Sequence, residues 1–238
     1  MRRVPSSVAI CAALSGLAFT AAAQQAPQLV IGGSQISSES SYTYLGVITP
    51  VQGARLGQGW FQKTVGSWLT YRYDTEHNGA PVGVRASAPG IETGMGYAWQ
   101  GESLKGDVSL TVGVRHTRLR PADVPTDGPE GTQLTLTPQL AAGYQFSRTV
   151  DADLIASYSL GTRSRFARLR WGFQPGGDWR AGLEGVLSQG PDYRNLQRGV
   201  FVGLPLAQGW FIDVNAGQVQ PRDGQRTPYV GLSFSRFR

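Results

Sequence analysis

Apolar and polar residues alternate with a period of two along much of the chain. From Val150 onward, apolar residues at every second position alternate with polar or small ones, and the same pattern recurs in the segments that begin at Val108, Leu134 and Trp210. Because successive side chains of a β-strand point to opposite faces, this period is typical of strands with one apolar face. The pattern predicts an all-β protein.

β-type runs rich in Val, Leu, Tyr, Phe, Trp and Thr follow residue 27, and clusters of Gly, Pro, Asn and Asp separate them. About twelve strands are expected, over residues 28–37, 41–50, 59–75, 82–100, 104–118, 131–146, 149–162, 163–175, 178–190, 196–206, 209–220 and 227–238. Pro138 within its run implies a bulge or a break in the ladder. Sandwich strands usually hold about 5 or 6 residues, whereas a tilted membrane strand needs ~9 to 11, so run length favours a membrane barrel.

Connections and aromatic residues point the same way. The tight connections lie near 147–149, 175–178 and 206–209, and the longer polar ones lie at 119–130, 190–196 and 220–227. The aromatic residues at run ends beside tight turns are Trp99, Tyr144, Phe146, Phe173, Trp179 and Trp210. Short periplasmic turns, longer outer loops and interfacial aromatic girdles are typical of outer-membrane barrels. We therefore predict an up-and-down antiparallel outer-membrane β-barrel of about twelve strands.

The first two dozen residues have the features of a signal peptide. Arg2 and Arg3 precede an apolar run over residues 8–20, and Ala21-Ala22-Ala23 supplies small residues for cleavage. Residues 1–23 are therefore predicted to be removed near Ala23, leaving residues 24–238 as a single barrel domain. The only cysteine, Cys11, would leave with the peptide. A chain without thiols excludes disulfides, thiolate metal sites and a Cys nucleophile.

Composition and charge exclude other classes. The chain is 40% hydrophobic with charges of both signs, which argues against disorder. After residue 23, no stretch reaches the ~18 to 20 apolar residues of a transmembrane helix. The net charge of +6 falls to 20 − 16 = +4 without Arg2 and Arg3. A mild surplus spread along the chain does not indicate a nucleic-acid partner.

Catalytic signals are weak. His77 lies in a turn sequence, and His116 lies near the outer end of its run. A barrel lipid hydrolase would need a Ser nucleophile within hydrogen-bond reach of a His, and no Ser is one strand step from His116. Asp151 and Asp153 share a strand face, but a metal site would need more oxygen ligands, so pairing with arginines of neighbouring strands is preferred. We expect a non-enzymatic protein with no cofactor and no metal.

Charged residues are predicted on the inner face. If Leu169 and Trp171 face lipid, Arg168 and Arg170 point inward. The other charged residues expected on this face are Arg180, Glu184, Asp213, Asp107, Arg115 and Glu92. Charges are tolerated within a bilayer only when they face the interior or pair with one another. They could form a plug of salt bridges, or line a narrow polar conduit or saccharide-contacting surface, and twelve strands permit either.

Several strand sequences resemble a known family. Residues 38–50, SESSYTYLGVITP, and residues 55–61, RLGQGWF, running into 67–74, SWLTYRYD, resemble the bacterial cellulose biosynthesis protein BcsS family. Further similar segments are residues 90–99, 138–144, 152–158 and 190–194. The resemblance implies an exported accessory of cellulose or related exopolysaccharide production and biofilm formation in the outer membrane. It implies neither an enzyme nor established binding residues.

The residues themselves suggest where a glucan would bind. We expect contacts with Tyr193, Asp192 and Arg194, because sugar rings stack on aromatic faces and hydroxyls need hydrogen-bond partners; alternatively, Gly190-Pro191-Asp192 is only a turn. Further candidate binding residues inside the barrel are Arg168, Arg170, Arg180, Glu184 and Asp213. Expected partners are outer-membrane lipid, cellulose or a related glucan, and periplasmic cellulose export components. Alternatives are a small outer-membrane pore, a structural barrel that holds a periplasmic partner and, less favoured, a lipid hydrolase.

Overall fold

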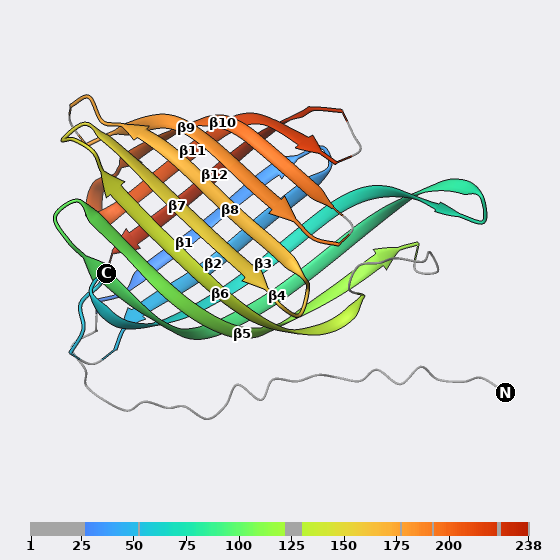
Figure 1. Cartoon of the computed structure of the whole chain (residues 1–238), viewed down its shortest axis with the longest axis horizontal. Coiled ribbons are helices and arrows are strands. Elements are labelled where there is room, and N and C mark those ends of the chain that lie inside the picture. The colour runs from blue at the N-terminus through green and yellow to red at the C-terminus, as the bar shows by residue number, and fades with distance from the viewer. Residues whose placement is uncertain are drawn as a thin grey trace.

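The protein is a closed antiparallel barrel of twelve strands in a computed structural model that describes residues 27–51, 53–121, 130–176, 178–191, 193–222 and 225–237 (Figure 1). The strands are β1 Leu29–Ser37, β2 Ser40–Pro50, β3 Gly59–His77, β4 Ala80–Gln100, β5 Leu104–Arg120, β6 Gly131–Gln145, β7 Val150–Ser159, β8 Ser164–Phe173, β9 Arg180–Gln189, β10 Arg194–Pro205, β11 Trp210–Pro221 and β12 Thr227–Phe237. Each strand pairs with its neighbours in sequence, and the predicted fold and strand number are confirmed. The predicted signal peptide lies outside the described residues.

The barrel closes between the first and last strands. β1 pairs antiparallel with β12 from Leu29↔Phe237 to Ser37↔Tyr229. Both chain termini of the barrel therefore lie at one end, which we name the terminal end, and the opposite end is the distal end. Closure removes the sheet edge, whose unpaired N–H and C=O groups could not be satisfied in hydrocarbon. None of the helices in the described ranges is long and apolar enough to cross a membrane.

The β6–β7 ladder ends beside Pro138. The last pair is Gln139↔Ser157, whereas the β5–β6 ladder continues through Leu110↔Pro138. Proline has no N–H to donate, so it interrupts pairing on one side only. The predicted break is confirmed on the β7 side, and β6 continues past it toward the distal end paired with β5.

The predicted contrast in loop length is only partly tested, because residues 122–129 and 223–224 of the predicted loops 119–130 and 220–227 lie outside the described residues. Distal connections at 38–39 and 78–79 are tight, and the terminal-end connection at 51–58 is longer than either. The predicted 190–196 loop is shorter than expected, because β10 begins at Arg194. The distal extension is instead made of strand: β3 and β4 continue as a hairpin beyond their neighbours (Figure 1). A paired hairpin satisfies its own backbone groups, so it can extend into water without a long loop.

The apolar face points outward and the polar face inward. On β5, Val108, Leu110, Val112 and Val114 are exposed, whereas Ser109 and Thr111 between them are buried. On β6 and β8, apolar side chains likewise point outward, and Leu134, Leu169 and Trp171 are exposed. A band of this kind is far larger than the apolar patches of soluble monomers, and it matches the outer surface of a membrane barrel.

Aromatic side chains ring the terminal end of this apolar band. Tyr144, Phe146, Trp171 and Phe173 are exposed there. The rings of the first three pack together, with centroids 4.8 Å apart for Tyr144–Phe146 and 4.9 Å for Phe146–Trp171. Trp60 and Tyr97 extend the ring, with centroids 5.4 Å apart. This arrangement is typical of residues at a membrane–water interface.

The outward band gives a direct test of membrane insertion. Val112 lies midway between Val108 and His116 on β5, so Val112→Arg should cost about 2–4 kcal/mol of unfolding free energy in lipid vesicles, as expected for a charge at the bilayer midplane. Ser157→Arg on the inner face is the matched control and should cost much less. Denaturant titration in vesicles measures both, and equal costs would contradict the assigned faces.

Candidate functional site in the barrel interior

A network of buried ion pairs fills part of the interior. Arg170 of β8 donates through Nε to Glu184 Oε2 of β9 at 2.5 Å, and its Nη1 lies 3.3 Å from Asp213 Oδ1 of β11. The Glu184 side chain is 0% exposed. Its second oxygen accepts hydrogen bonds from Asn215 Nδ2 at 2.6 Å and from the Tyr229 hydroxyl at 3.3 Å. A buried carboxylate needs such full coordination because its desolvation is costly.

A second group joins Arg180 to two aspartates. Arg180 Nη2 pairs with Asp151 and lies 2.6 Å from Asp153 Oδ2. Arg180 is on β9 and the aspartates are on β7, so the pair crosses β8 at Gly172, where a Cβ would collide with both Arg180 and Asp151. The aspartates pair with arginine as predicted, but the arginine lies two strands away and not on a neighbouring strand. The residues that the structure describes contain no group of three or more His, Cys, Asp or Glu placed to hold a metal ion.

Phe201 connects the two groups. Its ring is 1% exposed and lies 4.5 Å from the Arg170 guanidinium carbon and 5.0 Å from that of Arg180. Cations are attracted to the faces of aromatic rings. We name Arg170, Arg180, Glu184, Asp213 and Phe201 the ion-pair plug. The structure brings together four of the charged residues expected inside, as the plug interpretation requires.

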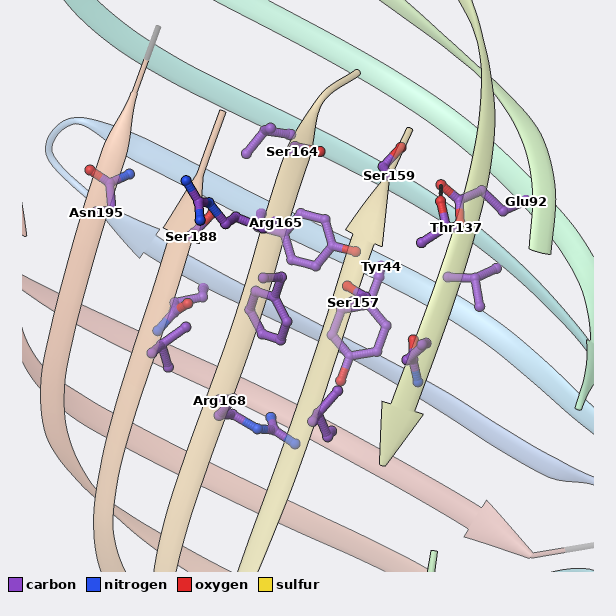
Figure 2. Close-up of a pocket in the computed structure, with 18 of the residues that line it drawn as sticks. Tyr44, Glu92, Thr137, Ser157, Ser159, Ser164, Arg165, Arg168, Ser188 and Asn195 are labelled. Atoms are coloured by element: carbon purple, nitrogen blue, oxygen red, sulfur yellow. Dashed lines mark hydrogen bonds between the residues drawn. The ribbon is translucent and has the colours of Figure 1, made fainter. Parts of the chain in front are cut away.

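A cavity of about 350 Å³, here named the chamber, occupies the interior beside the plug (Figure 2). Five tyrosines line it: Tyr42, Tyr44, Tyr71, Tyr193 and Tyr229. The rest of the wall combines hydroxyl and amide groups, including Ser157, Ser188 and Asn195, with apolar and charged side chains. Tyr42 is 37% exposed, and Tyr193 and Asn195 come from the distal end, so the chamber reaches that end of the barrel.

Three charged side chains of the wall have different environments. Lys63 Nζ donates to Ser109 Oγ at 2.9 Å and to Gln139 Oε1 at 3.2 Å. Glu92 Oε2 accepts from Thr111 Oγ1 at 2.9 Å. Arg168 faces the chamber and, among the described residues, forms neither an ion pair nor a side-chain hydrogen bond.

The chamber meets a second cavity of about 340 Å³ toward the terminal end. Asp107, Ile155 and Arg168 line both cavities, and we name these three residues the neck. Arg170 of the plug also lines the second cavity. The interior therefore has a distal chamber, a neck that contains Arg168, and a plug to one side.

The three predicted glucan contacts, Tyr193, Asp192 and Arg194, do not all lie at the chamber. Tyr193 lines the chamber and packs against Tyr71, with ring centroids 4.9 Å apart. Gly190 donates its N–H to the Tyr193 carbonyl at 2.9 Å, so this connection is a tight turn, as the alternative interpretation held. Arg194 is exposed and does not line the chamber, and Asp192 lies outside the described residues.

His116 lies on the outward side of β5, away from the chamber. Its Nδ1 is 2.9 Å from Thr132 Oγ1 on β6. No serine in the described ranges shares a hydrogen bond with this histidine. The geometry at His116 therefore lacks the serine–histidine contact that the hydrolase alternative required.

Four chamber tyrosines, Tyr42, Tyr44, Tyr71 and Tyr229, were missed at the level of sequence. Tyr42 and Tyr44 alternate with outward Leu45 and Val47 in a strand whose two faces are both apolar. Hydrophobicity alone cannot assign such faces. The tyrosine hydroxyls could have identified the inward face, because a hydroxyl group is more favourable in a hydrated interior than at the hydrocarbon midplane.

Comparison with solved structures gives the same architecture. The barrel resembles the KdgM porin in complex with disordered oligogalacturonate, with a TM-score of 0.51, 9% identity, and coverage of 87% of this chain and 98% of that chain. It also resembles the transport unit of the autotransporter AIDA-I from Escherichia coli, with a TM-score of 0.52, 12% identity, and coverage of 94% and 93%. At these identities the likeness shows the fold alone. Comparison with curated proteins gives no match.

The sequence match is more specific. Residues 29–238, from the first residue of β1 to the end of the chain, match the model of the family described as cellulose biosynthesis protein BcsS. The match includes every strand of the barrel and the entire chamber wall. The chain therefore belongs to the cellulose biosynthesis protein BcsS family.

Proposed function

We propose that this protein is a non-enzymatic outer-membrane accessory of cellulose biosynthesis that holds a short glucan segment in its chamber at the cell surface. The observation that carries the proposal is the chamber, whose wall combines five tyrosines with hydroxyl and amide groups. Family membership supports a role in cellulose production. The outward apolar band and the aromatic ring support insertion into the outer membrane.

The orientation follows from export. If the chain is exported by its leader and the barrel has an even number of strands, the terminal end faces the periplasm and the distal end faces the outside. The chamber then opens to the surface, where secreted polymer lies. The plug and the neck lie on the periplasmic side of it, near enough for components of the export machinery to act as partners.

The chemistry of the wall suits a neutral sugar chain. Aromatic faces stack on the C–H faces of pyranose rings, and hydroxyl and amide groups can donate to and accept from sugar hydroxyls. The volume of about 350 Å³ is at the lower end of the ~300–1,000 Å³ of ligand pockets, so it suits a short segment. Because the plug occupies part of the interior, the geometry favours surface attachment over passage of a whole polymer.

The proposal predicts a loss of glucan affinity when a chamber ring is removed. Tyr44→Ala should weaken cellohexaose binding about tenfold, equivalent to ~1.4 kcal/mol, because one stacking face is lost. Tyr158→Ala is the matched control, because Tyr158 is exposed on the outward face. Isothermal titration in detergent measures both. Equal affinity for the wild type and Tyr44→Ala, or an equal loss in Tyr158→Ala, would rule out the chamber as the glucan site.

A small pore is a second candidate, because the two cavities share the three neck residues. If the neck conducts, planar bilayers containing the protein should show a small conductance that increases in Arg168→Ala, since the side chain narrows the path. Ser157→Ala on the chamber wall serves as control and should leave the conductance nearly unchanged. Silent bilayers for the wild type and Arg168→Ala would exclude conduction through the neck.

A further inference from the structure

Four arginines lie together on the outward face near the distal end. Arg72 of β3, Arg85 of β4 and Arg120 of β5 form one cross-strand row, with Arg72↔Arg85 and Arg85↔Arg120 directly paired in register. Arg118 lies two residues below Arg120 on the same face of β5, opposite Ser87. All four side chains are exposed. We name them the arginine row.

The row has no ion-pair partner in the described part of the chain. None of its members forms an ion pair or a side-chain hydrogen bond there, and the ion pairs that do occur lie inside the barrel. Glu39 and Asp74 are near in the backbone but form no ion pair with the row. Directly opposed side chains have Cβ atoms about 4.5–5.5 Å apart, where like charges destabilise a sheet. Three directly opposed arginines without an ion pair therefore offer a site whose charge an anionic group would stabilise.

The position of the arginine row along the membrane normal indicates which anionic group it would meet. Trp60 and Trp68 lie on the outward face of β3, and Trp68 is 57% exposed. Eight residues separate them, which is ~27 Å along the strand, or ~20 Å along the membrane normal at a tilt of ~35–45°. Arg72 lies ~10 Å further out by the same geometry. The row is thus directly beyond the apolar band, at the level of lipid headgroups in the outer leaflet.

We propose that the arginine row binds the phosphate groups of a phosphorylated glycolipid in the outer leaflet, the lipid A headgroup of lipopolysaccharide. Planar guanidinium groups bind phosphate oxygens in bidentate fashion. Below the row, Trp68, Ile91 and Val114 are exposed and continuous with it, so the acyl chains of the same lipid would lie against them. The site lies outside the barrel and depends on membrane insertion, not on glucan binding.

The test compares one lipid with and without its phosphates. Folded protein in neutral detergent is titrated with fluorescent bisphosphorylated lipid A, and binding is read by anisotropy. The triple variant Arg72→Gln, Arg85→Gln, Arg120→Gln should bind about tenfold more weakly or worse, because the charged hydrogen bonds are lost. The double variant Arg55→Gln, Arg148→Gln removes exposed arginines from the terminal end and should bind like the wild type.

Further conditions separate the possible sources of binding. Wild-type affinity should fall in high salt and for dephosphorylated lipid A, since the attraction is electrostatic. Equal binding by the triple variant, or equal binding of the dephosphorylated lipid, would overturn the proposal. Competition by millimolar inorganic phosphate as effective as that by lipid A would identify a simple anion site and overturn the lipid assignment. Heat-modifiable migration verifies that each variant is folded, and cellohexaose affinity should be unchanged in the triple variant.

Discussion

The pairing of β1 with β12 is the contact on which the rest of the structure depends. Hydrocarbon offers no water to an unpaired N–H or C=O group, so a sheet in a membrane must close on itself. Closure gives each strand one face toward lipid and one toward the interior. The period of two in the sequence, the exposed Val108–Val114 series and the buried Ser109 and Thr111 are consequences of that single requirement.

Closure of twelve strands also leaves an interior that side chains only partly fill. Polar and charged groups turned away from lipid must find partners there. Arg170 and Glu184 do so through direct pairing, and Arg180 reaches Asp151 because Gly172 leaves room between them. Where the wall is made of tyrosines and hydroxyls, pairing does not fill the space, and the chamber remains. The plug and the chamber are thus alternative solutions to one constraint: the plug is filled by its own ion pairs, and the chamber leaves space for a ligand.

Local pattern predicted the strands well, because each strand must alternate along its whole length to satisfy lipid on one side. It also placed Arg170, Arg180, Glu184 and Asp213 inside. Partners were harder to predict: Arg180 and Asp151 are two strands apart, and their contact depends on a glycine of the intervening strand. Tyr42 and Tyr44 were missed because both faces of β2 are apolar. The arginine row requires the register across three strands, which sequence separation alone does not reveal.

Cell fractionation with gel electrophoresis of heated and unheated samples shows whether this chain is inserted in the outer membrane as a closed barrel. The protein should sediment with the outer membrane and migrate faster unheated than boiled, because the closed sheet resists detergent until heating. A soluble periplasmic protein with the same migration in both samples would show that the chain is not a membrane barrel. Its apolar faces would then have to pack against each other as a sandwich.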